Sequence, residues 1–177
     1  MSETVFETER LRAVLWRDDH AEPAFSAYSQ PEMVRYLGSG ATHPDIDYTH
    51  AWIGRIRKRS GDVGAEGGFW ALERRDTGEI VGATICSALP GGDGDHEIGW
   101  HVFPAHQGHG YATESGRGAA TYGFDQLGLD EVLATIIPGN DASVAVARKL
   151  GMTPLGRTTK YYDGIEFEVF SLRRPST

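Results

Sequence analysis

The stretch FPAHQGHGYATES, residues 103–115, joins an apolar strand pattern to a run of small residues typical of a helix. Gly108 and Gly110 permit backbone conformations that other residues rarely adopt, and they let a ligand approach the main chain closely. The first turn of a helix carries unpartnered N–H groups and about half a positive charge. The segment is therefore either an ordinary strand-to-helix turn or a nest of amide donors for an anion such as a phosphate.

The other sequence patterns predict a sheet covered by helices. Alternating or apolar runs predict strands at 9–16, 69–75, 80–89, 96–103, 131–137, 154–162 and 165–174. Helical spacing predicts helices at 20–29, 31–37, 46–59, 111–127 and 141–151. Asp18 and Asp19 are expected to cap the first helix, and Pro31 to open the second. This order of elements predicts an α+β fold with a largely antiparallel sheet.

We expect residues 1–177 to form a single domain, because a chain of this length can bury one hydrophobic core. The glycine-rich segment SGDVGAEGG, 60–68, predicts a mobile loop inside that domain and not a linker between two domains.

Charge and hydropathy argue against several classes of protein. The formal net charge is −8, whereas a nucleic-acid surface normally shows a basic patch, so we expect no nucleic-acid partner. No apolar run approaches the roughly 20 residues that span a bilayer. The acidic start MSETVFETER lacks the basic flank and apolar stretch of a signal peptide. We therefore expect a cytoplasmic protein with no membrane partner, whose acidity suits a cationic acceptor such as an amine.

Cys86 is the only cysteine, which excludes an intrachain disulfide and a zinc–cysteine cluster. It lies in the apolar run IVGATICSAL, which predicts a buried and unreactive thiol. His106 and His109, in the sequence HQGH, are spaced as a metal pair could be. The spacing identifies no third ligand, so we expect no metal there.

The glycine loop does not match the common nucleotide-binding motifs. The pattern G-x-x-x-x-G-K-[ST] is missing, and G-x-G-x-x-G would need a glycine near Thr113. What stands here is Gln107-x-x-Gly110-x-Ala112, with Pro104 just upstream. This pattern resembles the Q/R-x-x-G-x-G/A signature of the GCN5-related N-acetyltransferases (GNAT), in which the loop grips the pyrophosphate of coenzyme A.

A second segment supports the same resemblance. NDASVAVARKLGM, 140–152, is similar to the N-x-x-S-x-x-V-x-x-K-L-G-[FM] segment of the ribosomal-protein N-acetyltransferase (RimJ/RimL-type) branch of that superfamily. Further segments that are similar to this branch stand in the same order over nearly the whole chain: TERLRAVLW, PEMVRYLG, TGEIVGATI, EIGWHVFP and FDQLGLDEV.

The resemblance implies a twisted, mostly antiparallel sheet of six or seven strands, splayed between strands 4 and 5, with acetyl-CoA entering the splay. The strand that ends at Val102 and Phe103 would offer backbone groups to the pantetheine arm. The phosphates would be held by the loop residues Gln107, Gly108, His109, Gly110, Tyr111, Ala112 and Thr113. Asn140 would hydrogen-bond near the pantetheine, and Ser143 would lie near the sulfur.

Several of these residues also have ordinary structural explanations. Asn140 is a good N-cap for a helix that Gly151 ends, with Lys149 near its negative end. Ser143 is, by the resemblance, a candidate general acid for the departing thiolate, although serine is also common in a first helical turn. Tyr161 and Tyr162 are alternatives, although tyrosines before a turn are more often packing residues.

The general base must remove a proton from an amine that arrives mostly protonated. In the strand at 96–103, alternation places Glu97, Gly99 and His101 on one face. Glu97 is the first candidate base and His101 the second, and a water chain is a third possibility. Glu97 could instead only orient the substrate or form a solvated ion pair, and a β-bulge would shift the alternation.

Two further features concern the packing of the sheet. The branch often has a tyrosine near the end of its last strand, where this chain has Phe170. If that hydroxyl orients substrate in relatives, this chain does without it. The helix after the loop contains Gly116, Gly118 and Gly123, and close packing against the sheet is the plainest explanation.

The sequence thus predicts transfer of an acetyl group from acetyl-CoA to a primary amine, either a protein N-terminus or a small molecule. The amine would attack directly in a ternary complex, with the backbone of the Val102 strand polarising the carbonyl. Cys86 lies in another strand without a basic partner, which disfavours a covalent acyl-enzyme. The alternatives are a non-catalytic CoA-binding sensory or regulatory module and a structural protein without a cofactor. We expect a monomer or a homodimer.

Overall fold

The computed structural model describes residues 4–60 and 67–176. The predicted mobile loop at 60–68 falls mainly on residues 61–66, which lie outside the described residues. The strands are β1 (Thr4–Glu7), β2 (Leu11–Val14), β3 (Gly67–Arg74), β4 (Ile80–Ala88), β5 (His96–Val102), β6 (Glu131–Ile136), β7 (Thr153–Thr158) and β8 (Phe167–Arg173). The α-helices are α1 (Ala21–Tyr28), α2 (Pro31–Val34), α3 (Ile46–Ser60), α4 (Tyr111–Asp125) and α5 (Asp141–Lys149).

The strands form one sheet in the order β1-β2-β3-β4-β5-β6-β8-β7, and each pair is antiparallel except β5 with β6. The α+β prediction is confirmed, and the strand count exceeds the expected six or seven because Thr4–Glu7 adds a short edge strand on β2. Its sequence, TVFE, is too short and too acidic at its end to show a clear alternation.

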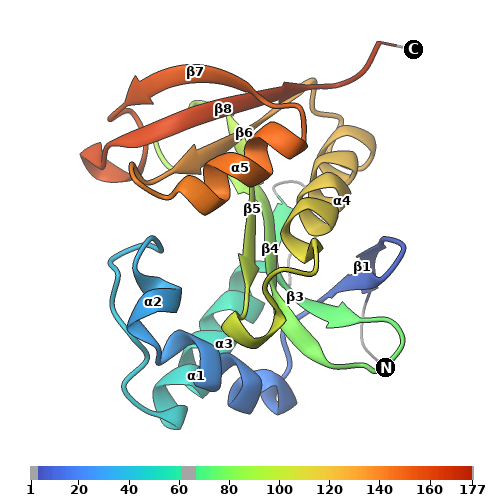
Figure 1. Ribbon diagram of the computed structural model, residues 1–177, viewed down its shortest axis with the longest axis vertical. Coiled ribbons are helices and arrows are strands. Elements are labelled where there is room, and N and C mark those ends of the chain that lie inside the picture. The colour runs from blue at the N-terminus through green and yellow to red at the C-terminus, as the bar shows by residue number, and fades with distance from the viewer. Residues whose placement is uncertain (1–3, 61–66, 177) are drawn as a thin grey trace.

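Strands β5 and β6 diverge almost as soon as they meet. Their ladder is reduced to a single register pair, Glu97 with Leu133, whereas β4 and β5 pair over the whole length of β5. Beyond that pair the two strands separate, and Figure 1 shows α5 and the strands after β5 forming the upper part of the molecule. This divergence confirms the splay predicted between strands 4 and 5 of the sequence pattern.

Helix α4 covers one face of the central strands, and α1 and α3 cover the other (Figure 1). A Cβ added to Gly116 would lie 2.9 Å from Leu150 and 3.0 Å from Trp100, and one added to Gly118 would lie 2.5 Å from Phe6. The expected close packing of the glycines in α4 is thus confirmed. Phe170 is buried in the same core and pairs with Ala134 of β6.

Two local predictions have opposite outcomes. Pro31 opens α2 as expected. Asp18 and Asp19 do not cap α1: they form a 3-10 turn with His20, and no side-chain hydrogen bond caps the helix. No helix among the described residues is long and apolar enough to cross a bilayer.

Candidate functional site

The loop between β5 and α4 presents a row of unpartnered amides. After β5 the chain forms a 3-10 turn, Pro104–His106, and then passes through Gly108 and Gly110 with φ of +80° and +82°. Such values favour glycine. Within the described parts of the chain, the amides of residues 108–113 make no hydrogen bond. The amide of Gln107 donates to the carbonyl of Pro104 at 3.4 Å, so the row starts one residue later than the sequence suggested.

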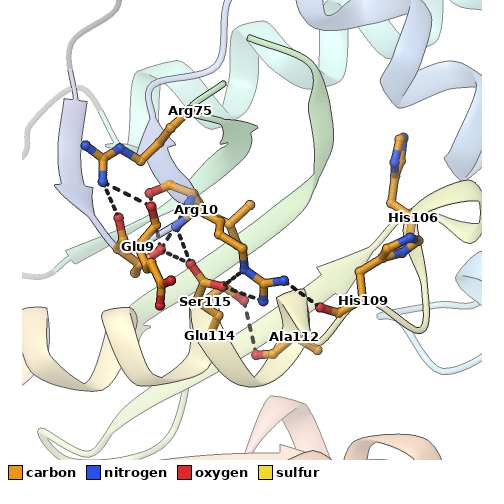
Figure 2. Close-up of polar contacts among 10 residues, drawn as sticks. Glu9, Arg10, Arg75, His106, His109, Ala112, Glu114 and Ser115 are labelled. Atoms are coloured by element: carbon orange, nitrogen blue, oxygen red, sulfur yellow. Dashed lines mark hydrogen bonds and ion pairs between the residues drawn. The ribbon is translucent and has the colours of Figure 1, made fainter. Parts of the chain in front are cut away.

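Arg10, from the turn before β2, holds this loop from behind (Figure 2). Its Nη1 donates to the carbonyl of His109 at 3.0 Å, and its Nε donates to Oε2 of Glu114 at 2.7 Å. The backbone amide of Arg10 and the hydroxyl of Thr8 both donate to Oε1 of Glu114, at 2.7 and 2.6 Å. The loop carbonyl and the first-turn carboxylate are thereby satisfied by protein, while the row of amides is left available.

Glu114 is consequently held ionised. Burial alone would raise the pKa of its carboxyl, but the hydrogen bonds from Thr8 and Arg10 outweigh burial and hold that pKa below its ordinary value. Sequence reasoning missed this clamp, because Arg10 and Glu114 are 104 positions apart and each is unremarkable in its own segment.

A cavity of about 500 Å³ adjoins the loop. One wall is the loop itself, the second is the end of β5, and the third is α5 with Lys149. Residues after α2, Tyr36 and Leu37, form part of the remaining side. The cavity brings together these residues that the sequence predicted to bind a cofactor: Val102, Gln107, Gly108, Gly110, Tyr111, Ala112, Thr113, Asn140 and Ser143.

Two predicted cofactor-binding residues lie elsewhere. The amide of Phe103 donates to Val81 of β4, and its ring is buried with α1 and α3, so Phe103 turns away from the splay. The side chain of His109 stacks on Tyr111, and its Nδ1 is 3.1 Å from the carbonyl of His106, so His109 meets the row only through its backbone.

The backbone of β5 alternates between its two neighbours. Because Phe103 bonds to β4, the peptide groups of Trp100 and Val102 are directed to the other edge, where β6 has moved away. The side-chain amide of Gln107 donates to the carbonyl of Val102 at 3.2 Å. The amides of Trp100 and Val102 are thus the strand groups that face the splay.

A second cavity, of about 230 Å³, continues from the first through the splay. The two share six lining residues: Tyr36, Leu37, Trp100, His101, Asn140 and Ser143. The hydroxyl of Tyr36 donates to the carbonyl of Gly139 at 3.0 Å. This bond ties the segment after α2 to the loop before α5, on opposite sides of the shared region.

Glu97 is buried in the wall of the second cavity. Its Oε2 accepts a hydrogen bond from Thr135 at 2.7 Å, and its Oε1 accepts one from the hydroxyl of Tyr162. Burial raises the pKa of the Glu97 carboxyl, and the two hydrogen bonds oppose that rise. Burial and the neighbouring Glu97 charge together raise the pKa of the Tyr162 phenol. Tyr162 therefore keeps its proton and donates it in the hydrogen bond, and the carboxyl of Glu97 accepts that bond.

An unusual turn directs Tyr162 to Glu97. Tyr162 and Asp163 have φ of +50° and +58°, and Gly164 follows with +92°. Residues other than glycine adopt such values at a cost in energy, and they concentrate at functional sites. The hydroxyl of Tyr161 instead donates to Asp95 at 2.8 Å. Only Tyr162 of this tyrosine pair lines either cavity.

His101 lies at the junction of the two cavities. Its Nδ1 is 3.2 Å from the hydroxyl of Tyr28, and its ring packs edge-on against Phe69. Burial lowers the pKa of His101 to about 4, which leaves the imidazole neutral at physiological pH. The β4–β5 register has no bulge, so the alternation that placed Glu97 and His101 on one face is confirmed.

Asn140 is the N-cap of α5, as predicted. Its Oδ1 accepts a hydrogen bond from the amide of Ser143 at 3.2 Å. The helix ends at Lys149, and Gly151, just beyond the C-cap Leu150, has a φ of +79°. The cap fixes Ser143 at the junction of the two cavities, where Asn140 also forms part of the wall.

Cys86 and His109 line neither cavity, whereas His106 lines the first one. Cys86 is buried in the core under α4, which confirms the prediction of a buried thiol. Burial, followed by the charge of Glu97, raises the pKa of that thiol to about 12. Nε2 of His106 is 3.5 Å from Glu79. Over residues 4–60 and 67–176, no three His, Cys, Asp or Glu side chains form a cluster that could hold a metal.

Comparison with known proteins gives a consistent result. Residues 10–153 match the family model described as an acetyltransferase (GNAT) domain. The chain is 30% identical over 176 residues to the uncharacterised N-acetyltransferase YoaA of Bacillus subtilis, and the match covers 97% of each protein. A GNAT-family acetyltransferase structure from Bacillus anthracis aligns with a TM-score of 0.77 and 20% identity over 98% of both chains. The ribosomal-protein acetyltransferase RimL in complex with coenzyme A aligns with a TM-score of 0.76 and 14% identity, over 97% of this chain and 98% of that one.

Proposed function

Because the chain belongs to the GNAT family and is an N-acetyltransferase, we propose that it moves the acetyl group of acetyl-CoA to a primary amine by direct attack in a ternary complex. The observation that carries the proposal is the row of free amides at residues 108–113, which opens onto a cavity continuous with the one that holds Glu97. One end of this path suits a diphosphate and the other suits an amine.

The residues present fit coenzyme A. A diphosphate needs several N–H donors, and the row lies at the positive end of α4, with the carboxylate of Glu114 already neutralised by Arg10. A narrow arm would run along the amides of Trp100 and Val102 in the splay. The coenzyme A in the RimL structure, which shares this fold, supports the same assignment.

When bound, acetyl-CoA supplies an activated acyl group and a thiol leaving group with a pKa of about 8.5. Glu97 would accept the proton of the incoming ammonium, since its carboxylate is buried, faces the cavity and has a raised pKa. The amide of Val102 would donate to the carbonyl oxygen as negative charge develops there. Ser143 would donate a proton to the departing thiolate, with Tyr162 as the alternative donor. His101, neutral and enclosed, is the second candidate base.

The proposal is tested by calorimetry with coenzyme A and acetyl-CoA, followed by an assay of thiol release with a panel of amines. Glu97→Gln should lower kcat about 100-fold or more, the range found for general-base groups. Ser143→Ala should lower kcat less, because a thiolate leaves without much assistance. Glu166→Gln, an exposed carboxylate on the approach to β8, is the matched control and should leave kcat unchanged. An unaltered kcat in Glu97→Gln would remove Glu97 from the mechanism.

The alternative is a module that binds coenzyme A without turnover. It would give binding heat with the cofactor and no thiol release with any amine. A candidate base, Glu97, and a candidate proton donor, Tyr162, both line the second cavity, which favours the enzyme. We further infer that residues 1–177 act as a single N-acetyltransferase domain, because one sheet runs from β1 to β7. A cytoplasmic location, a monomeric or homodimeric state and the lack of nucleic-acid and membrane partners stay predictions from the sequence.

A further inference from the structure

We propose that the acceptor is a primary amine on a compact, uncharged, apolar body, with no carboxylate or phosphate beside the amine. This inference rests on the proposed function, because it takes the second cavity as the place where the amine lies. Three properties of that cavity support it: its charge, its apolar lip and its size.

The charge of the described lining residues has one sign. Glu97 is the only Asp, Glu, Lys or Arg among them, and its carboxylate is buried. Residues 1–3, 61–66 and 177 contain neither lysine nor arginine. Lys149 lines the first cavity and not the second. An acceptor that carried its own carboxylate would place a second anion beside Glu97, and the described lining residues include no Lys or Arg to pair with it, which is unfavourable.

Arg35 is the cation nearest in sequence to the lining, but it is not itself a lining residue. Its guanidinium lies over the ring of Tyr36, 5.1 Å from the centroid, and the residue is exposed and does not line the cavity. The ammonium of an acceptor, in contrast, has a partner in Glu97 within the wall.

The lip and half of the lining residues are apolar, and the polar side chains of the lining are Tyr36, Glu97, His101, Thr135, Asn140, Ser143 and Tyr162. Ile165 lines the cavity at its lip, where the residue is 41% exposed. Leu37 lines the same cavity from the segment after α2. Farther along the wall are Ile85, Ile136 and Phe167. An apolar body on the acceptor would cover these surfaces and gain free energy from their burial.

The volume of the cavity suits a body of about one ring. The cavity has a volume of about 230 Å³, and an apolar protein cavity of about 150 Å³ is known to hold benzene. A single aromatic ring or a branched alkyl group with a short arm to the amine therefore fits.

The test uses three ligands that differ only beside the amine: phenethylamine, phenylalaninamide and phenylalanine. Their dissociation constants are measured by calorimetry on the protein saturated with coenzyme A, so the result does not depend on turnover. Phenethylamine and phenylalaninamide should bind about 100-fold more tightly than phenylalanine, the scale set by two like charges a few ångströms apart at a protein surface. Comparison of the first two separates a free small amine from an amine flanked by an amide, as at a peptide terminus.

A variant adds the missing cation. Ile165→Arg should tighten phenylalanine binding about tenfold and weaken phenethylamine binding, while Ile165→Gln, which is polar but uncharged, should not tighten phenylalanine binding. Equal affinity for phenylalanine and phenethylamine in the unsubstituted protein would overturn the inference, as would no binding of phenethylamine. Acetylation of phenylalanine as fast as of phenethylamine would overturn it and leave acetyl transfer standing. Binding of coenzyme A without thiol release would instead count against the proposed function, whatever the amine affinities.

Discussion

The phenol of Tyr162 donates a hydrogen bond to Oε1 of Glu97, a residue 65 positions earlier in the sequence. The bond joins the turn between β7 and β8 to β5, across the splay of the sheet. It connects a candidate base to a tyrosine whose own backbone is held in an unfavourable conformation. A substitution of the tyrosine should therefore be visible in the ionisation of the carboxyl.

Tyr162→Phe should shift the acid limb of the pH–rate profile to higher pH. The hydrogen bond from Tyr162 favours the ionised carboxylate and lowers the pKa of Glu97, so its removal leaves burial less opposed and the pKa rises. Activity that needs ionised Glu97 is then lost at a higher pH than in the unsubstituted protein. The measurement is kcat/KM from pH 5 to 9. Tyr161→Phe, which removes a hydrogen bond to Asp95, is the control and should leave the acid limb in place. An unmoved limb in Tyr162→Phe would show that Glu97 is not the group titrating.

Gly108→Ala should weaken coenzyme A binding about tenfold or more, because a Cβ at φ of +80° forces the loop to rearrange and moves the row of amides. Gly128→Ala is closely matched: its φ is +69°, and in both positions an added Cβ meets nothing within 4 Å. The two variants should lose similar amounts of stability, and only the first should lose affinity. Equal cofactor affinity in both, measured by calorimetry, would contradict the phosphate site.

Arg10→Ala should reduce cofactor affinity without touching the cofactor cavity directly. Arg10 does not line that cavity, but it holds the carbonyl of His109 and neutralises Glu114. Its loss leaves a negative charge at the start of α4 and a looser loop, so we expect coenzyme A to bind about tenfold more weakly and more so at low ionic strength. Arg173→Ala, which removes an exposed cation at the end of β8, controls for the change in net charge. A matching loss of affinity in the control would assign the effect to net charge alone.

Stability should fall as the pH is lowered from about 6.5 to about 4. His20 is 2% exposed, and burial, followed by the charge of Arg17, lowers its pKa to about 4. Between these pH values the unfolded chain binds a proton on His20 and the folded chain does not. The free energy of unfolding therefore decreases as the pH falls through this range. Above about pH 6.5, His20 contributes no pH dependence. Urea unfolding at several pH values should show a smaller dependence in His20→Gln than in the exposed-site control His50→Gln. The same slope in both would exclude His20 as a source.

Intact mass measurement after incubation with acetyl-CoA alone should show no acetyl adduct. The Cys86 thiol is buried and its pKa is raised to about 12, so the nucleophilic thiolate is scarce at neutral pH. Cys86→Ala should keep its catalytic rate and lose on the order of 1 kcal/mol of stability, the loss expected for a small buried side chain. A stoichiometric adduct on Cys86 would replace direct attack by a covalent intermediate.

Local patterns predicted the parts of the site that depend on local geometry. The alternation of β5 placed Glu97 and His101 on one face, and the Asn140 cap and the Gly151 end fixed α5. These features depend on residues within one strand or one turn. The family resemblance then supplied the splay and the order in which the segments meet.

Contacts between distant segments could not be predicted. The bonds of Arg10 with Glu114, Tyr36 with Gly139 and Tyr162 with Glu97 link residues about a third or more of the chain apart. A single sequence contains no signal for such pairs. The sequence indicated a turn after Tyr162 but not the left-handed conformation of Tyr162 itself, which contradicts the ordinary preference of tyrosine. Phe103 was misplaced for a simpler reason: one step along a strand reverses the direction of the peptide group.

The single bridge between Glu97 and Leu133 has a mechanical consequence. Beside this short ladder, the two halves of the sheet are joined by α4, which contacts β4 and β5 on one side and β6 and α5 on the other, and by the hydrogen bonds of Glu97 with Thr135 and Tyr162. A molecule bound in the opening would add further contacts between the two halves and stabilise their relative position. Occupancy should then slow amide hydrogen exchange far from the binding residues, in β7 and β8 as much as in the loop itself.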